Sequence, residues 1–238
     1  MAAVKSEHLD AGFTDPTQPR NVRLAAEGAS RIAAEKRGWP RERLPFPVEA
    51  LLAHVNSVRF LSDVGLRDAA LVAVGVRLML RPGELAKMMI GDIQVRGEDI
   101  RVRLGKTKAD QKSERRPLPL ERVLSSPACP VKLLKAWMLR RRAQGAPDSA
   151  RLFLGAAGRA LTSSAISSIV RRMVEAHGLD PKAFAGHSLM IGGASAALAG
   201  GLSVDQVMAV GGWKSDAVKQ YLAPVLRKQQ SVAKKMGF

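Results

Sequence analysis

The chain has 238 residues, of which 46% are hydrophobic and 25% are charged, and its formal net charge is +17. These proportions exclude a collagen-like, mucin-like or wholly disordered chain, and the length allows one large domain with or without a small appendage. The single cysteine, Cys129, excludes an intramolecular disulfide and a zinc site built on clustered cysteines. Because no apolar run reaches the roughly 18 residues of a membrane span and no secretory signal opens the chain, we expect an intracellular protein, cytoplasmic or nuclear according to its host, with no membrane partner.

The N-terminal region divides into three predicted parts. Residues 1–19 are polar and contain two prolines, so we expect them to be disordered or to form an arm. Residues 20–37 repeat apolar side chains at helical spacing, and the Gly-Trp-Pro triplet that follows ends this helix. A charged, proline-bounded linker covers residues 41–47, and the helical pattern resumes at Val48.

A strongly apolar segment over residues 68–80 predicts a buried helix. The residues Arg81, Pro82, Gly83 and Glu84 follow it directly. Proline suits the first turn of a helix, and a carboxylate there is favoured by the positive end of the helix dipole. A second, short helix is therefore expected to begin at Pro82.

The periodicity then changes from that of a helix to that of strands. Apolar residues at 93, 95, 100, 102 and 104 alternate with polar or basic ones, and a Gly-Glu-Asp turn separates the two runs. This pattern predicts a β-hairpin with one buried face and one basic face. A third strand is expected over residues 116–120, where its prolines confine it to an edge, and a flexible basic loop is expected over residues 105–115.

Only helical patterns follow the predicted sheet, over residues 130–142, 162–176, 188–199, 203–210, 215–222 and 224–238. The predicted fold class is therefore mainly α with a small antiparallel β-sheet inserted early (α+β).

The positive charge belongs to the body of the chain and not to its first segment. Residues 56–238 contain 30 Lys/Arg against 14 Asp/Glu, a surplus of 16, whereas residues 1–55 contribute a surplus of one. Such a surplus favours binding to a polyanion through counterion release. Two alternatives stay open at this point: a merely basic soluble surface, and a helical scaffold that binds RNA or sits in a ribonucleoprotein.

Four separated motifs occur in a characteristic order. They are Leu-Arg-Pro-Gly-Glu-Leu at 80–85 with Gly-Asp-Ile at 91–93, Gly-Lys-Thr-Lys at 105–108, Gly-His-Ser-Leu-Met-Ile-Gly at 186–192, and Gly-Gly-Trp-Lys-Ser-Asp at 211–216 followed by Tyr221. Together they resemble the catalytic domain of the tyrosine recombinase (phage integrase) family over about residues 43–238. The wording of the last motif is most similar to the branch carried by eukaryotic retroelements.

The resemblance implies cleavage of DNA by a tyrosine phenolate, which leaves a 3′-phosphotyrosyl link that a 5′-hydroxyl later resolves, without a metal or other cofactor. It assigns Tyr221 as the nucleophile, the only tyrosine of the chain. The other implied catalytic residues are Arg81 and His187 at the phosphate, Lys108 as the acid for the leaving 5′-oxygen, and Trp213 as a ring N–H donor. An arginine suits such a site because its planar fork meets two phosphate oxygens. Glu84 and Asp92 match the positions that support Arg81 and its helix.

The resemblance also implies double-stranded DNA as the partner and a homo-oligomer on DNA, a tetramer in synapsis. Residues 1–19 then form an arm, residues 20–42 a remnant helix of a core-binding domain plus linker, and residues 43–238 the catalytic domain, with a C-terminal helix over 224–238 that packs on a neighbouring protomer. The basic residues expected to contact DNA are Lys106, Lys112, Arg115, Arg116, Arg171, Arg172 and Lys214.

The chain departs from the family's His-x-x-Arg pattern because Met190 stands where the second arginine is expected. Methionine carries no charge and donates no hydrogen bond, and removal of one donor from a preorganised anion site costs about 10²–10³ in rate. Three explanations are open: a domesticated or decayed recombinase that still binds DNA, a copy altered to trap a complex, or compensation by a nearby cation such as Arg171 or Arg172.

Each assigned residue also fits an ordinary structural role. Arg81 fits a cation at a helix start, His187 a capping or core histidine, Trp213 a core side chain and Tyr221 a surface-packed tyrosine, while Lys106 could replace Lys108 as the acid. The spacing from Trp213 to Tyr221 is one residue shorter than in many bacterial and phage members. The N-terminal part is about half the length of the usual core-binding domain, which fits a shortened clamp or a fragment of a longer chain.

Overall fold

The computed structural model describes residues 2–37, 43–57, 62–105, 117–155 and 158–213, and it divides into two units, Met1–Glu42 and Arg43–Phe238. The first unit holds α1 (Ala2–Asp10) and α2 (Arg20–Arg37). The helix α2 confirms the predicted helix over 20–37. The helix α1 lies inside the segment expected to be disordered or an arm, and its described side chains are all exposed.

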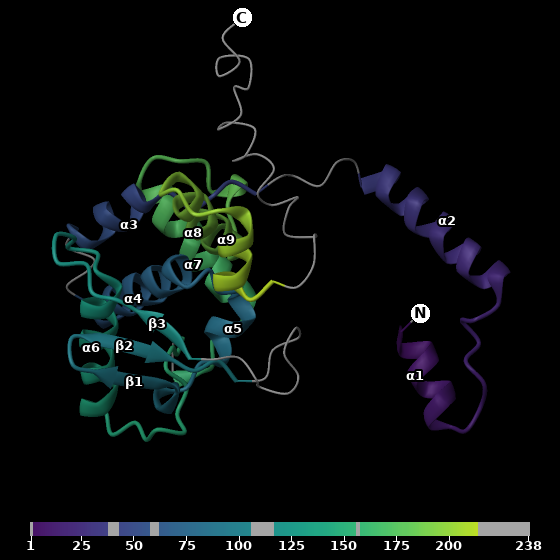
Figure 1. The fold of residues 1–238 in the computed structure, drawn as a ribbon, viewed down its shortest axis with the longest axis horizontal. Coiled ribbons are helices and arrows are strands. Elements are labelled where there is room, and N and C mark those ends of the chain that lie inside the picture. The colour runs from purple at the N-terminus through teal and green to yellow at the C-terminus, as the bar shows by residue number, and fades with distance from the viewer. Residues whose placement is uncertain (1, 38–42, 58–61, 106–116, 156–157, 214–238) are drawn as a thin grey trace, which may run out of the picture. The chain divides into compact units, whose positions relative to one another are not determined.

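The second unit is mainly helical with one small sheet (Figure 1), which confirms the predicted fold class. Its longer helices are α3 (Val48–Val55), α4 (Asp63–Arg77), α6 (Pro130–Ala143), α7 (Ser163–Ala176), α8 (His187–Ala199) and α9 (Val204–Gly211), and its short ones are α5 (Pro82–Lys87) and the 3₁₀ turns η2 (Ile90–Asp92) and η4 (Pro181–Ala183). The strands are β1 (Ile93–Arg96), β2 (Asp99–Val102) and β3 (Leu118–Leu120). In the described ranges, no helix has the length and apolarity that would let it cross a membrane.

The helix α4 is central to this unit because it packs against α3, α5, α6 and α8. It begins at Asp63, five residues before the expected start, because the Ser62 side chain accepts a hydrogen bond from the backbone N–H of Gly65 (2.9 Å) and caps the helix. The early turns also bury Arg67 and Asp68, which pair with each other (2.5 Å). The buried Arg67, which precedes the predicted segment, therefore belongs to the helix through its pairing with Asp68.

The predicted end of this helix was wrong by three residues, because the chain turns sharply after Arg77. The N–H of Leu80 donates to the carbonyl of Gly75 (2.9 Å), and the N–H of Met79 donates to that of Val76 (3.2 Å). This is a Schellman motif, whose left-handed position is usually glycine. Here Met79 occupies it with φ +51°, at a cost of about 1–2 kcal/mol. The turn directs the chain into Arg81 and α5.

Two adjacent glycines let α8 approach its neighbours closely. A Cβ added at Gly193 would lie 2.0 Å from the carbonyl oxygen of Val76, near the end of α4. A Cβ at Gly192 would lie 2.6 Å from the carbonyl oxygen of Phe46, whose own N–H donates to the carbonyl of Ser188 (2.9 Å). Phe46 is buried, so the last part of the expected linker over 41–47 packs as part of the core.

The three strands form an antiparallel sheet in the order β1-β2-β3, which confirms the predicted hairpin and the third strand at an edge. Ile93 pairs with Val102, and Pro119 pairs with Arg101. The expected inner face is only partly correct, because Ile100 and Val102 are fully buried whereas Val95 is 51% exposed. On α6, the Lys135 ammonium donates to the carbonyl of Gly97 (2.9 Å) and fastens the hairpin turn.

The observed bounds of α6, α7, α8 and α9 agree with the predicted helices to within one residue at each end. The helices expected over 215–222 and 224–238, and most of the basic loop expected over 105–115, lie outside the described residues.

Substitution of Gly193 by alanine tests the close contact between α4 and α8. We expect Gly193→Ala to lower the free energy of unfolding by about 2–4 kcal/mol, because its methyl group would collide with a backbone oxygen that cannot rotate away. Gly200→Ala is the matched control: its Cβ would meet its nearest atoms at 3.4 Å, and its φ of −78° suits alanine. Urea unfolding should show a change within about 0.5 kcal/mol for this control. Equal effects in both variants would contradict the close contact.

Candidate active site

Arg81 stands directly before α5 and is held by the first turn of that helix. Its backbone N–H donates to Oε2 of Glu84 (2.7 Å), and its guanidinium Nη1 lies 3.5 Å from Oε1 of the same carboxylate. The Glu84 side chain is 8% exposed, whereas that of Arg81 is 38% exposed. A buried carboxylate therefore lies against a partly exposed arginine, and the predicted role of Glu84 in the support of Arg81 stays a prediction.

Four of the predicted site residues line one hollow of about 540 Å³: Arg81, Glu84, Asp92 and His187. His187 comes from the start of α8, more than 100 residues after Arg81 in the chain. Gly105, the last described residue before the rest of the predicted basic loop, also lines this hollow. The hollow brings together a cation, an imidazole and the start of the loop that carries Lys108.

The imidazole of His187 is accessible, but its surroundings disfavour a proton. Partial burial lowers its pKa below the ordinary value of 6.5, and the positive charges of Arg81 and Arg43 lower it further. The neutral form of the His187 ring is therefore favoured in the free protein. An anion placed between these groups would offset the two cations and favour the protonated ring.

Asp92 lies at the opposite end of α5 from Arg81. Its carboxylate accepts a hydrogen bond from the N–H of Met89 (2.8 Å), and its carbonyl accepts one from the N–H of Arg103 (2.8 Å). Asp92 thus stabilises the segment that connects α5 to β1. In the described structure it forms no bond to Arg81. The role that the sequence resemblance assigns to Asp92, support of Arg81 and its helix, stays a prediction.

Two further cations, Lys87 and Arg151, line the same hollow and were missed by the sequence analysis. Arg151 is brought there by an isolated bridge to Met89, and its Nη1 donates to the carbonyl of Lys87. The charge of Lys87, in the last turn of α5, was visible in the sequence. The pairing of residue 151 with residue 89 had no local signal.

Met190 and Trp213 lie in a separate apolar cluster and do not line the hollow. Met190 is 3% exposed and Trp213 is 7% exposed, and the cluster also contains Met79, Ala194, Leu198 and Val207. Within the described ranges, the buried Trp213 Nε1 has no hydrogen-bond acceptor. The position expected to carry the second arginine is thus part of an apolar core, and the spacing of residues 190, 194 and 198 is its sequence signal.

The two arginines considered as compensating cations, Arg171 and Arg172, form other contacts. Arg171 Nε donates to the carbonyl of Phe184 (3.2 Å), and Arg172 Nη2 lies 3.4 Å from Oδ2 of Asp68. Neither lines the hollow with Arg81 and His187. The remaining predicted site residues lie outside the described residues, namely Lys106, Lys108, Lys112, Arg115, Arg116, Lys214 and Tyr221.

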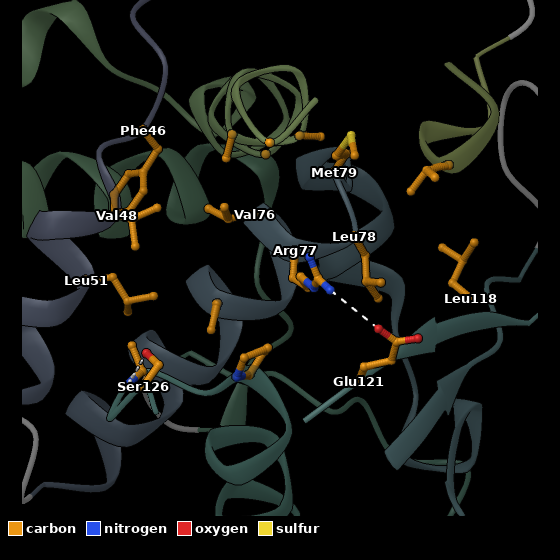
Figure 2. Close-up of a pocket in the computed structure, with 18 of the residues that line it drawn as sticks. Phe46, Val48, Leu51, Val76, Arg77, Leu78, Met79, Leu118, Glu121 and Ser126 are labelled. Carbon is orange, nitrogen blue, oxygen red and sulfur yellow. Dashed lines mark hydrogen bonds and ion pairs between the residues drawn. The ribbon is translucent and has the colours of Figure 1, made fainter. Parts of the chain in front are cut away.

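A second hollow, of about 600 Å³, lies between α3, α4, β3, α8 and α9 and holds none of the predicted site residues. Figure 2 shows apolar side chains such as Phe46, Leu51 and Met79 around it, with the Arg77–Glu121 ion pair (3.8 Å) among its lining residues. Its chemistry is that of an apolar groove rather than an anion site.

The profile of the Phage integrase family matches residues 45–225. The integrase/recombinase XerD homologue of Selenomonas ruminantium is 27% identical over 210 residues, which cover 83% of this chain and 58% of the relative. The chain therefore spans less than two thirds of that relative's length.

Comparison with solved structures gives the same fold. The XerH recombinase bound to its palindromic difH substrate aligns with a TM-score of 0.63 and 19% identity, over 82% of this chain and 53% of that chain. The XerA recombinase aligns with a TM-score of 0.58 and 22% identity, over 80% and 65%. A lambda integrase tetramer bound to a Holliday junction aligns with a TM-score of 0.53 and 18% identity, over 92% and 62%.

Substitution of Met190 tests whether its pocket is built for an apolar side chain. We expect Met190→Arg to lower the free energy of unfolding by about 3 kcal/mol or more, because it would bury a charge among apolar neighbours. Met190→Leu, which nearly conserves volume, should cost less than about 1.5 kcal/mol. Thermal and urea unfolding compare the two variants. Equal stability of Met190→Arg and the unmodified chain would show that this position opens to solvent or to an anion.

Proposed function

The chain belongs to the phage integrase family, and from this premise we propose that it binds double-stranded DNA and acts on one backbone phosphate in the hollow beside Arg81. The observation that carries the proposal is the convergence of Arg81 and His187, from distant parts of the chain, on one accessible hollow. A fixed guanidinium and a nearby imidazole suit a phosphodiester, because an arginine meets two phosphate oxygens. The surplus of positive charge over residues 56–238 favours the polyanion as partner.

The proposed reaction is strand cleavage and rejoining by a tyrosine recombinase. The phenolate oxygen of Tyr221 attacks phosphorus, a P–O bond forms to tyrosine, and the bond to the 5′-oxygen breaks. Lys108 gives a proton to that leaving oxygen, Arg81 holds the charge that develops on the phosphate, and a 5′-hydroxyl later reverses the step. The predicted role of Trp213 as a ring N–H donor to the phosphate requires a rearrangement, because Trp213 is buried outside the hollow. The resemblance to the retroelement branch stays a prediction.

Met190 favours a second candidate, a DNA-binding descendant in which cleavage is impaired or lost. Its side chain is buried with Met79 and Trp213, so the site lacks the donor that the family pattern places there. The neighbouring cations that do line the hollow, Lys87 and Arg151, could attract the backbone but lie at the far end of α5 from Arg81. The conformation therefore supports DNA binding more strongly than a normal cleavage rate.

We also propose assembly on DNA, as a tetramer in synapsis, inside the cell in the cytoplasm or the nucleus according to the host. The lambda integrase relative forms a tetramer on a Holliday junction. In this chain the apolar groove of Figure 2 offers a surface for the apolar residues that recur over 224–238 of a neighbouring protomer. We propose that residues 1–19 form an arm, that residues 20–42 are a remnant of a core-binding domain plus linker, and that residues 43–238 form the catalytic domain.

Nicked suicide duplexes with a randomised core test the proposed reaction without knowledge of the target. We expect a covalent protein–DNA adduct from the unmodified chain that is absent in Tyr221→Phe, because no other phenol is available. Gel shift with the same duplexes should show that both proteins bind DNA, and that binding weakens steeply with salt. Tighter binding to RNA at matched salt would favour the RNA scaffold instead.

The same assay distinguishes a recombinase that cleaves DNA from a catalytically silent descendant that only binds it. If the chain is silent, the unmodified protein binds DNA but yields no adduct. Met190→Arg, assayed below its unfolding temperature, then gains a Tyr221-dependent adduct provided that its side chain leaves the apolar cluster and reaches the phosphate. Met190→Leu is its control and should gain none. A normal cleavage rate from the unmodified chain would overturn the silent reading, and the absence of DNA binding in all variants would overturn the proposed function.

A further inference from the structure

Three side chains on one stripe of α7 face the segment that leads into α8. They are Ser163, Ser167 and Arg171, spaced by four residues, so they lie on one face of the helix. Ser163 lines the hollow with Arg81 and His187. Arg171 donates through Nε to the carbonyl of Phe184 (3.2 Å). The stripe therefore lies along the segment 184–187 from one end to the other.

The central member, Ser167, forms two hydrogen bonds in series. Its Oγ donates to the carbonyl of Ser163 (2.9 Å) and accepts from the backbone N–H of Gly186 (3.0 Å). Because the hydroxyl proton is committed to the Ser163 carbonyl, the oxygen lone pairs are left for Gly186. The N–H groups at the start of a helix have no partner within that helix, so the acceptor for the residue before His187 comes from a different helix.

Gly186 is also in close contact with the turn that carries Arg81. A Cβ at Gly186 would lie 2.5 Å from Cγ of Pro82 and 3.3 Å from Oγ of Ser167. The space where a side chain at position 186 would stand is therefore occupied by the Pro82 ring and the Ser167 hydroxyl, and both groups lie close to the Gly186 backbone. Pro82 adjoins Arg81 and Gly186 adjoins His187, so this contact joins the two halves of the site.

We propose that Ser167 is a positioning residue, whose hydroxyl holds the Gly186 backbone through its N–H at the close contact with Pro82 and so sets His187 relative to Arg81. The inference rests on the proposed function for its catalytic meaning, but the positioning itself is a property of the free protein. Ser167 touches neither Arg81 nor His187 through any bond in the described structure. It acts through Gly186, and its replacement changes the site without removing any group from it.

The chain offers a closely matched control for this residue. Ser168 is the next residue on α7, has the same intermediate exposure, and its Oγ donates to the carbonyl of Ser164 (3.2 Å) in the same pattern. It has no bond to Gly186 in the described structure. Ser167→Ala and Ser168→Ala therefore remove the same hydroxyl and the same bond within the helix, and only the first removes the acceptor for Gly186.

The test is an NMR titration of the His187 imidazole in the full chain, with its signal assigned by His187→Gln. In Ser167→Ala we expect the pKa of His187 to rise toward its ordinary value and its ring signal to shift, because the ring moves away from the cations and the burial that lower that pKa. Ser167→Thr, which keeps the hydroxyl, should restore the original titration. Ser168→Ala should leave it unchanged.

Unchanged titration and ring shift in Ser167→Ala, or an equal change in Ser168→Ala, would overturn the proposal. Suicide duplexes add the functional readout: a misplaced site should form adduct on the order of 10- to 100-fold more slowly in Ser167→Ala, with DNA affinity retained. If no variant forms adduct, the proposed cleavage fails, whereas the His187 titration still decides the role of Ser167. A variant that unfolds is recognised by its spectrum. If Ser167→Ala unfolds, Ser167→Cys, whose thiol is a weak acceptor for the Gly186 N–H, takes its place and should shift the His187 titration in the same direction.

Discussion

The contact between α8 and the end of α4 determines where the candidate catalytic groups lie. At Gly193 the backbone of α8 approaches the carbonyl oxygen of Val76 more closely than any side chain would allow. The chain leaves α4 immediately afterwards through the left-handed Met79 and enters Arg81. The start of α8 carries His187, so one close helix contact and one strained turn together bring a guanidinium and an imidazole to the same hollow.

The apolar cluster beside this turn explains why a methionine at position 190 is compatible with the fold. Met79 is buried although its backbone is strained, and its side chain packs with Met190 and Trp213. Burial of a methionine contributes about 1.5–3 kcal/mol, which offsets the cost of the left-handed turn. An arginine at position 190 would need an anion or solvent to stabilise its charge among these apolar side chains. The apolar cluster therefore stabilises the turn before Arg81 while it removes a positive charge from the phosphate site.

Much of the fold could be predicted from the sequence because its signals are local. The hairpin, the edge strand and most helices follow from period and from prolines, and the start of α5 follows from Pro82 and Glu84. The start of α4 could not be predicted, because Arg67 precedes the apolar segment and its burial depends on its pairing with Asp68. The exposure of Val95 likewise depends on what covers the sheet, which no alternation of residues reveals.

The candidate site was predictable only where a motif carried it. The order of the motifs placed Arg81, Glu84, Asp92 and His187 together, and the structure brings these four to one hollow. Arg151 and Ser167 belong to no motif. Arg151 reaches the hollow through its bridge to Met89 and its bond to Lys87, and Ser167 acts on the site through its bond to Gly186. Met190 fell within a motif, but its partners Met79 and Trp213 come from other segments, so its burial required the assembled fold.

The central claim is that the hollow beside Arg81 and His187 receives a DNA phosphate, and the titration of His187 with and without DNA tests it most directly. A short duplex at low salt, added to saturation, should raise the pKa of the imidazole, because a phosphate beside it favours the protonated ring and offsets Arg81 and Arg43. A rise of the His187 pKa means that DNA binding takes up a proton. DNA affinity should therefore increase as the pH falls through the range in which His187 titrates. His177, at the end of α7, serves as the reference signal. An unchanged pKa of His187 with DNA fully bound would contradict the account.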